Sequence, residues 1–146
     1  MDIVDKSTRS RMMSGIRGKN TKPEILIRSL LHRRGYRFRI HDRKLPGKPD
    51  IVLPKYRAVI FINGCFWHGH KCNLFKMPSP RTEFWENKIN TKRLNDERSI
   101  RALQAEGWRI AIVWECAMKG PKKKDETCII DSISIWLRGE NKNLEI

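Results

Sequence analysis

Apolar residues recur at helical spacing in three segments of the chain. Residues 21–24, TKPE, combine a capping threonine, a first-turn proline and an acid, and the apolar stripe after them predicts a helix over about 22–34. A second helix is expected over about 82–106, with Asn90-Thr91 as a candidate bend. The third segment, 129–137, predicts a final amphipathic helix.

Four shorter segments have the pattern of strands. Residues 36–40 alternate apolar with arginine, as a half-buried strand does, whereas 50–53 and 58–62 are nearly continuous apolar runs. These three are expected to form a meander. A long helical crossover leads to 108–114, which can therefore lie parallel to 58–62. The order helix, three strands, helix, strand, helix predicts an α/β fold, with helices on both faces of a small mixed β-sheet.

The length of the chain predicts the number of domains, and its charge predicts the class of partner. With 146 residues the chain is expected to be one domain, residues 21–146, preceded by a basic N-terminal arm, residues 1–20. The chain has 31 lysines and arginines against 16 acids, a net charge of +15. Nucleic acid is the usual partner of a small basic domain, because each neutralised phosphate releases counterions. The alternative is a basic surface with no dedicated ligand.

Four cysteines bear on the compartment and on metal binding. No apolar run reaches 18 residues and the N-terminus lacks a signal-like apolar segment, so we expect a cytoplasmic protein with reduced cysteines. Three thiols and an imidazole make a closed set that suits structural zinc. The candidate ligands are Cys65, His70, Cys72 and Cys116. Cys128 falls within the last helix and is expected to be a buried thiol. The alternative is ordinary core cysteines and a surface histidine.

A second candidate site lies where two predicted strands meet. Asp50 begins one strand and Ile62 ends the next, so the Asp50 carboxylate and the Ile62 backbone can approach each other in a hairpin-like pair. A carboxylate with a carbonyl oxygen suits Mg²⁺, which can clamp a phosphodiester. His68 is close in sequence and can take a proton from an attacking water. Plainer interpretations remain: Asp50 as an acid at a strand start, His68 as a zinc ligand, and Glu24 as a helix cap only.

Large aromatic residues accompany these candidate sites. Phe66 and Trp67 lie in a polar, glycine-flanked segment, and Trp85 follows a proline-rich break. Apolar side chains on a basic protein can insert between base pairs and unstack them, which is least costly at a mismatched pair. The alternative is that these rings pack over the predicted zinc site as core.

Taken together, these segments resemble the very short patch repair endonucleases, which are mismatch-specific nicking enzymes. The matching segments are DKSTRSRMMSGI, LPGKPDIVLP, AVIFINGCFWHGHKC, RTEFWENKI and GWRIAIVWECA. They fall in order over about residues 5–120, and the pair CFWHGHKC and VWECA is highly specific. The resemblance implies a restriction-endonuclease-like fold, consistent with the order of elements above.

The resemblance also implies a role for each matching residue. Asp50 and the main-chain carbonyl of Ile62 would bind catalytic Mg²⁺, Glu24 would reach the metal through water, and His68 would be the general base. The zinc ligands would be Cys65, His70, Cys72 and Cys116. The wedge that enters the DNA would be Phe66, Trp67 and Trp85, with Met13 of the N-terminal arm opposite. Ile62 and Asn63 stand where well-known members have threonine and histidine. Asn63 in place of histidine removes a possible proton-transfer partner. The role of Asp96, an acid that matches the same catalytic region, depends on that partner.

By resemblance, the substrate is double-stranded DNA with a T:G mismatch, formed when 5-methylcytosine deaminates. One strand is nicked 5′ of the thymine, leaving 5′-phosphate and 3′-hydroxyl ends. The resemblance further implies a monomer that works with a DNA cytosine methyltransferase and with downstream repair synthesis. Two alternatives stay open: a related restriction or defence nuclease with another DNA substrate, and a non-enzymatic, zinc-stabilised DNA-binding module.

Overall fold

A five-stranded mixed sheet forms the centre of the fold, in the spatial order β1-β2-β3-β4-β5. The structure is a computed structural model that describes residues 21–65, 70, 72 and 81–146. The strands are β1 (Arg39–Ile40), β2 (Ile51–Leu53), β3 (Ala58–Asn63), β4 (Arg109–Trp114) and β5 (Asn143–Glu145). Strands β1, β2 and β3 form an antiparallel meander, whereas β4 is parallel to both β3 and β5.

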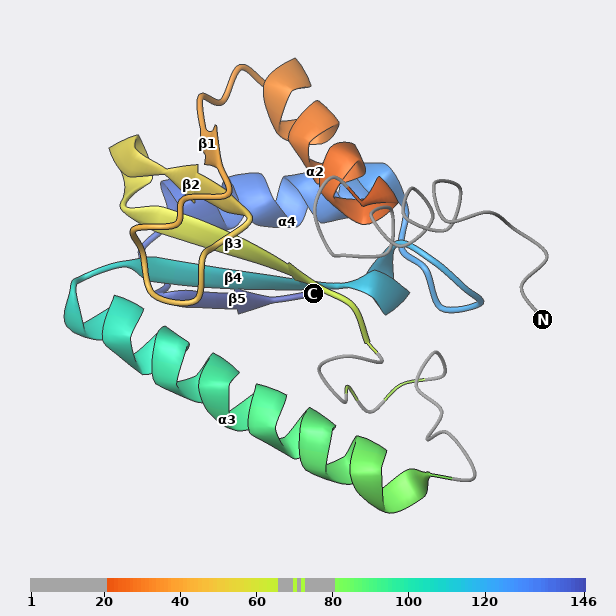
Figure 1. The fold of residues 1–146 in the computed structure, drawn as a ribbon. Helices are drawn as coiled ribbons and strands as arrows, with labels where there is room; N and C mark the ends of the chain where they lie inside the picture. The colour runs from red at the N-terminus through yellow and green to blue at the C-terminus, as the bar shows by residue number, and fades with distance from the viewer. Residues whose placement is uncertain (1–20, 66–69, 71, 73–80) are drawn as a thin grey trace, which may run out of the picture.

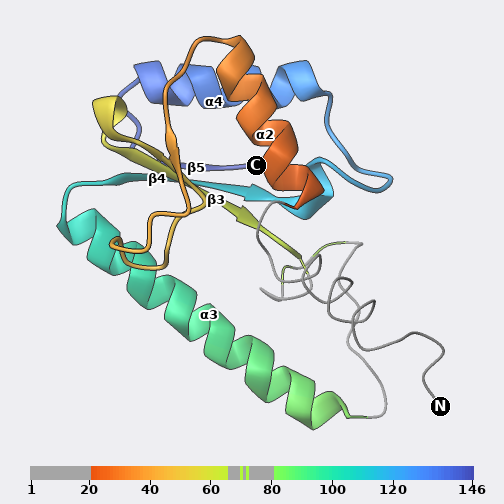
Figure 2. The same ribbon diagram turned by 45° about the horizontal axis from the view of Figure 1, so that its top comes forward.

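Helices cover both faces of this sheet (Figure 1). They are α2 (Lys22–Arg33), α3 (Thr82–Ala105) and α4 (Glu126–Arg138). Helices α2 and α4 lie together on one face, and α3 crosses the other (Figure 2). The larger core lies under α2 and α4, where Ile27, Ile60 and Ile133 are fully buried. A smaller core under α3 joins Val59, on the opposite side of β3, to Leu103.

The predicted α/β class and mixed sheet are confirmed, and so are the meander and the parallel pairing of β3 with β4. Helix α2 begins as expected, because the Thr21 side chain accepts a hydrogen bond from the Glu24 N–H. Helix α3 is one continuous element through Asn90 and Thr91, so the candidate bend does not form a break. None of the helices in the described ranges is long and apolar enough to cross a membrane.

Three expectations about the fold are corrected. Only Arg39 and Ile40 of the segment 36–40 pair as strand, because Tyr36 turns into the core beside Tyr56. Strand β5 was not expected, because the alternation of polar and apolar residues over 143–146 is too short to tell a strand from a loop. Cys128 is exposed on α4 and is not a buried thiol, since it lies on the solvent side of that amphipathic helix.

Arg109 at the start of β4 joins the sheet to the end of α4. Its guanidinium donates to the carbonyl oxygens of Trp136, Leu137, Gly139 and Asn141, and lies 4.8 Å from the centre of the Trp136 ring. These carbonyls belong to the helix end and to the segment after it, where the backbone lacks helical partners. One side chain therefore supplies the hydrogen-bond donors for the carbonyl oxygens of the turn between α4 and β5.

We expect Arg109→Ala to lower the free energy of unfolding by about 2 kcal/mol, since several carbonyls lose a charged donor at once. Denaturant unfolding followed by circular dichroism measures this change. The matched control is Arg34→Ala, which removes an exposed ion pair with Asp131 and should cost under about 1 kcal/mol. Equal losses in the two variants would contradict the role given to Arg109.

Two clusters of candidate metal ligands

Asp50 and the backbone of Ile62 meet where β3 ends. Strand β2 runs antiparallel to β3, so Asp50, just before β2, lies beside the last residues of β3. The Asp50 Oδ2 atom accepts a hydrogen bond of 2.7 Å from the Ile62 N–H. Within a strand the N–H and C=O of one residue point to the same neighbouring strand, so the Ile62 carbonyl is directed to this edge as well. The approach of Asp50 to the Ile62 backbone is therefore as predicted.

Helix α2 brings a second carboxylate to the same place. Glu24 lies in the first turn of α2 with 1% of its surface exposed. Single ligand atoms of Glu24, His41 and Asp50 all lie within 4.8 Å of one another, and we call these three residues the acidic cluster. Carboxylate oxygens are the donors that Mg²⁺ prefers. The donor set therefore fits a hard divalent cation, and the catalytic role of Glu24 stays a prediction.

His41 is a member of this cluster that the sequence did not reveal. It follows β1 directly, and its N–H bonds to the Asp50 carbonyl at 3.2 Å. Its Nε2 atom lies 3.1 Å from Glu24 Oε2, and Arg28 donates to the same carboxylate oxygen at 2.8 Å. The Glu24–Arg28 pair has i, i+4 spacing, a signal that was available in the sequence. The contact of His41 crosses a loop and has no such signal.

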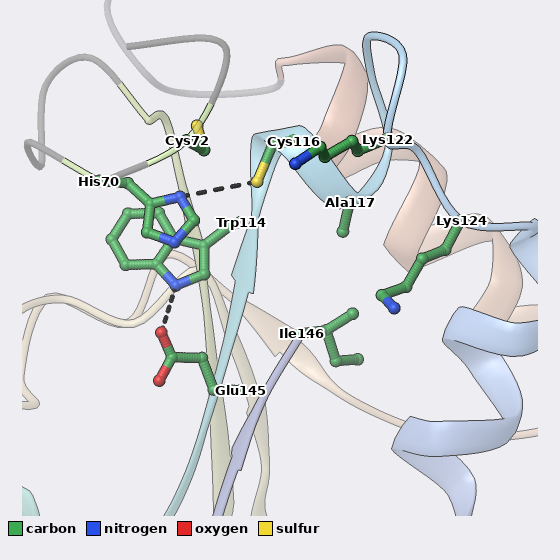
Figure 3. A pocket seen from close by; sticks show the side chains of 9 residues that line it. All are labelled: His70, Cys72, Trp114, Cys116, Ala117, Lys122, Lys124, Glu145 and Ile146. Carbon is green, nitrogen blue, oxygen red and sulfur yellow. Dashed lines mark hydrogen bonds between the residues drawn. The ribbon is translucent and has the colours of Figure 1, made fainter.

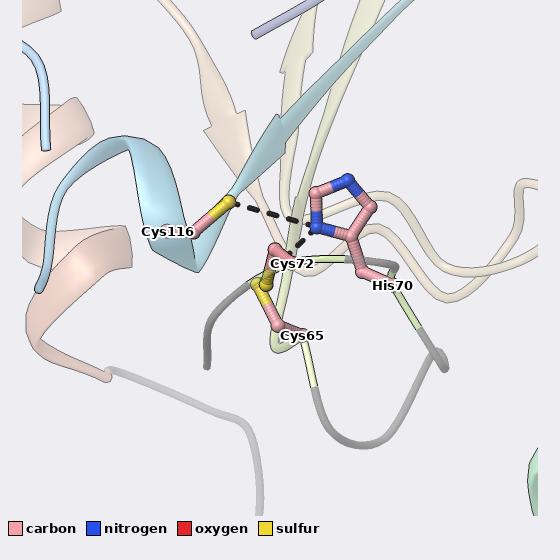
Figure 4. A group of neighbouring side chains, drawn as sticks. All are labelled: Cys65, His70, Cys72 and Cys116. Carbon is pink, nitrogen blue, oxygen red and sulfur yellow. Dashed lines mark hydrogen bonds between the residues drawn. The ribbon is translucent and has the colours of Figure 1, made fainter. Parts of the chain in front are cut away.

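The four candidate zinc ligands come together at the same end of the sheet (Figure 4). Cys65 follows β3 and Cys116 follows β4, and because these strands are parallel their ends adjoin. The ligand atoms of Cys65, His70, Cys72 and Cys116, which we call the cysteine cluster, all lie within 4.8 Å of one another. The four side chains are therefore grouped as expected, and their role as zinc ligands stays a prediction.

Distances within the cysteine cluster fit tetrahedral zinc. His70 Nδ1 lies 3.5 Å from Cys65 Sγ and 3.6 Å from Cys116 Sγ. Zinc bonds of about 2.3 Å to sulfur and about 2.0 Å to nitrogen place these atoms roughly 3.6 Å apart in a tetrahedral site. Burial raises the pKa of the Cys65 thiol to about 12, raises the pKa of Cys116 and lowers the pKa of His70. A bound cation would therefore have to displace thiol protons that burial otherwise retains.

The orientation of His70 is set by its neighbours. Its ring stacks on Trp114, with ring centres 4.0 Å apart and planes 4° from parallel. The Trp114 Nε1 donates in turn to Glu145 of β5 at 2.7 Å (Figure 3). These three side chains form one wall of an open pocket beside the cysteine cluster. The unexpected strand β5 thus helps to fix a candidate zinc ligand.

The other candidate site residues lie apart from both clusters or outside the described residues. Asp96 is on α3, on the opposite face of the sheet from α2, with its carboxylate 3.6 Å from Lys92. Trp85 is in the first turn of α3, where its ring packs edge-on against Phe84, and Lys88 lies over it at 5.4 Å. Their functional roles stay predictions. The predicted residues outside the described part are Met13, Phe66, Trp67 and His68.

Comparison with known proteins shows which family the sequence resembles. The family model for DNA mismatch endonuclease Vsr matches residues 1–74. The chain is 46% identical to DNA mismatch endonuclease Vsr of Escherichia coli K12, over 99% of this chain and 93% of that protein. It is 50% identical to the type II nicking enzyme V.XorIIP of Xanthomonas oryzae, over 80% and 86% of the two chains. For the nicking enzyme V.NmeAIP of Neisseria meningitidis the identity is 45%, over 81% and 84%.

Proposed function

The chain belongs to the Vsr family of DNA mismatch endonucleases, and from this premise we propose that it nicks T:G-mismatched DNA, 5′ of the thymine. It is a DNA endonuclease, as its relatives are named. The proposed mismatch is the one formed when 5-methylcytosine deaminates. The proposed products carry 5′-phosphate and 3′-hydroxyl ends.

One observation carries the catalytic part of the proposal. Glu24 and Asp50 come from different elements, yet their carboxylates share the acidic cluster with the Ile62 backbone at its edge. In the proposed site Asp50 and the Ile62 carbonyl would hold Mg²⁺, and Glu24 would reach the ion through water. When bound, the ion supplies a clamp on the phosphodiester and stabilises the charge that develops on it. Asp50 is oriented for this by the hydrogen bond from the Ile62 N–H.

The proposed general base is His68, which would take a proton from the attacking water. In the sequence it lies between Cys65 and His70, two members of the cysteine cluster. We propose that structural zinc in this cluster holds these two flanking residues in place. The distances that fit tetrahedral zinc support this assignment. Asp96 is a proposed further acid of the catalytic region, and its position on α3 adds no argument for that role.

A cluster of cations and rings at the start of α3 supports DNA contact. Arg81 lies 4.4 Å from the centre of the Phe84 ring, and Lys88 approaches both Phe84 and Trp85. Phe84 is 45% exposed, so this pair of rings is only partly covered. We propose that Trp85 belongs to the wedge that unstacks the mismatch, together with Phe66, Trp67 and Met13. The net charge of +15 supports binding to the DNA phosphate backbone on either side of the mismatch.

Trp85→Ala is expected to weaken binding to a T:G duplex about tenfold or more, because base-aromatic stacking contributes roughly 1–3 kcal/mol. Fluorescence anisotropy with a labelled duplex measures the affinity, and thermal unfolding checks that the fold is kept. The same variant should lose less affinity for a matched T:A duplex, in which unstacking is already costly. Equal losses on the two duplexes would argue against a wedge.

The remaining parts of the proposal follow from family membership. They are a restriction-endonuclease-like fold, which the mixed sheet with helices on both faces supports, and a monomeric enzyme that works in the cytoplasm on nucleoid DNA. The mismatch chemistry implies a DNA cytosine methyltransferase in the same cell and repair synthesis after the nick.

The position and chemistry of the cut test this function. A T:G duplex labelled on either strand should yield one product in Mg²⁺, cut 5′ of the thymine, whose 5′ end is a substrate for phosphatase. EDTA should abolish the product. A cut in both strands, or an equal cut of a matched methylated duplex, would favour a restriction-type nuclease instead.

A further inference from the structure

The buried carboxylate of Glu24 is held by two cationic or hydrogen-bonding groups that the proposed reaction does not use. Arg28, one turn later on α2, donates to Glu24 Oε2 at 2.8 Å. His41 Nε2 approaches the same oxygen at 3.1 Å and lies 3.1 Å from the Arg28 guanidinium. A carboxylate with 1% exposure needs such partners, because burying an unpaired charge is costly.

The backbone at His41 ties this arrangement to Asp50. His41 has φ of +50°, a left-handed conformation that is uncommon for residues other than glycine. The His41 N–H bonds to the carbonyl of Asp50, so the turn that presents the imidazole to Glu24 is anchored on the proposed metal ligand itself. An unusual backbone conformation at a candidate site indicates a constrained position.

We propose that Arg28 and His41 are positioning residues, which restrain Glu24 to bind a water of the metal and keep it from binding the metal directly. The proposal rests on the proposed function of the acidic cluster and deepens it. Arg28 and His41 both engage Oε2, which fixes the carboxylate in one orientation. The positive charge of Arg28 also lies beside the place that a cation would take, and so weakens cation binding.

This arrangement predicts opposite changes in metal binding and turnover. Without Arg28, the Glu24 carboxylate loses one of the two restraints described here, and a nearby positive charge is removed. We expect Arg28→Ala to bind the metal about fivefold more tightly, because a like charge near a cation site is removed. Nicking at saturating metal should fall at least about tenfold, because a misplaced group in the site slows the reaction. A loss of fold alone cannot tighten metal binding.

The experiment uses full-length, zinc-loaded protein and Mn²⁺ as the probe ion. Binding is read from the electron paramagnetic resonance signal of the free ion, without DNA, and nicking rates are measured on a T:G duplex at saturating Mg²⁺. Arg28→Lys should keep Mn²⁺ affinity near that of the wild type, because the charge is retained. It should recover only part of the rate, because lysine lacks the planar guanidinium that approaches both Glu24 and His41. Arg34→Ala, at the far end of α2, should change neither quantity.

The His41→Asn variant tests the second positioning residue. Asparagine tolerates the left-handed conformation, so the turn is kept, but its side chain is shorter than that of histidine. The nicking rate should fall about threefold to tenfold with little change in Mn²⁺ affinity, since the Arg28 charge remains. A fall in thermal stability with an unchanged rate would assign His41 a structural role only and overturn its part of the proposal.

A Glu24→Ala background separates action through Glu24 from other effects. In that background Arg28→Ala should cause no further loss of rate, because the group that it positions is absent. A further tenfold loss would overturn the proposal, as would unchanged or weaker Mn²⁺ binding by Arg28→Ala in the otherwise wild-type chain. Absence of T:G nicking by the wild type would instead defeat the proposed function, so the two failures are distinguishable.

Discussion

Replacing Asp50 by alanine is expected to reduce nicking by about a thousandfold or more, while the zinc content of the protein stays the same. The proposed metal contributes several kcal/mol of charge stabilisation in the transition state, and each 1.4 kcal/mol is about a tenfold change in rate. The Asp50 carboxylate lies at the Ile62 backbone, where it accepts a 2.7 Å hydrogen bond from the N–H. Single-turnover nicking of a T:G duplex measures the loss.

Asp50→Asn is the matched variant for this prediction. Its amide oxygen can still accept the hydrogen bond from the Ile62 N–H, so the end of β3 should keep its geometry. It lacks the negative charge and should lose nearly as much activity as the alanine variant. If either variant nicks at close to the wild-type rate, the assignment of Asp50 to the catalytic metal is wrong.

Cys116→Ser is expected to lose zinc and to destabilise the fold by about 3 kcal/mol or more, because metal binding and folding are coupled in a structural site. For a chain of this length, that corresponds to a fall in melting temperature of roughly 10 °C. Cys116 follows β4, and the other ligands follow β3, so its loss removes the link between the ends of these two strands. Nicking should fall in parallel. Zinc content by atomic absorption and calorimetric unfolding measure the two effects.

Cys128→Ser is the control for the zinc prediction. Cys128 is exposed on α4 and is not a member of the cysteine cluster, so its substitution should leave zinc content, stability and nicking unchanged. Should Cys116→Ser retain one zinc per chain and melt with the wild type, the cluster would not be a structural zinc site.

The sequence predicted those parts of the site that depend on strand order. The apolar run at 58–62 and the crossover to 108–114 imply adjoining parallel strand ends, which is where Cys65 and Cys116 meet. The approach of Asp50 to Ile62 likewise follows from an antiparallel pair of strands. These features could be predicted because hydrophobic periodicity and connection length determine strand pairing.

Contacts made by side chains across loops could not be predicted in this way. The contact of His41 with Glu24 depends on one left-handed residue after a two-residue strand, and neither feature has a periodic signal. The short strand β5 is specified mainly by its tertiary partners, which include Arg109 and Trp114. The exposure of Cys128, by contrast, could have been predicted, because the apolar stripe of the last helix leaves position 128 on the opposite side.

The most direct test of the central claim is the ratio of nicking rates on two duplexes that differ in one base. The two substrates share one sequence, with a T:G pair in one and a T:A pair at the same position in the other, and both are measured in Mg²⁺ with zinc-loaded protein. We predict a ratio of at least about a hundredfold in favour of T:G, since unstacking is least costly at the mismatch. Equal rates on the two duplexes, or no Mg²⁺-dependent nicking of either, would contradict a mismatch-specific endonuclease.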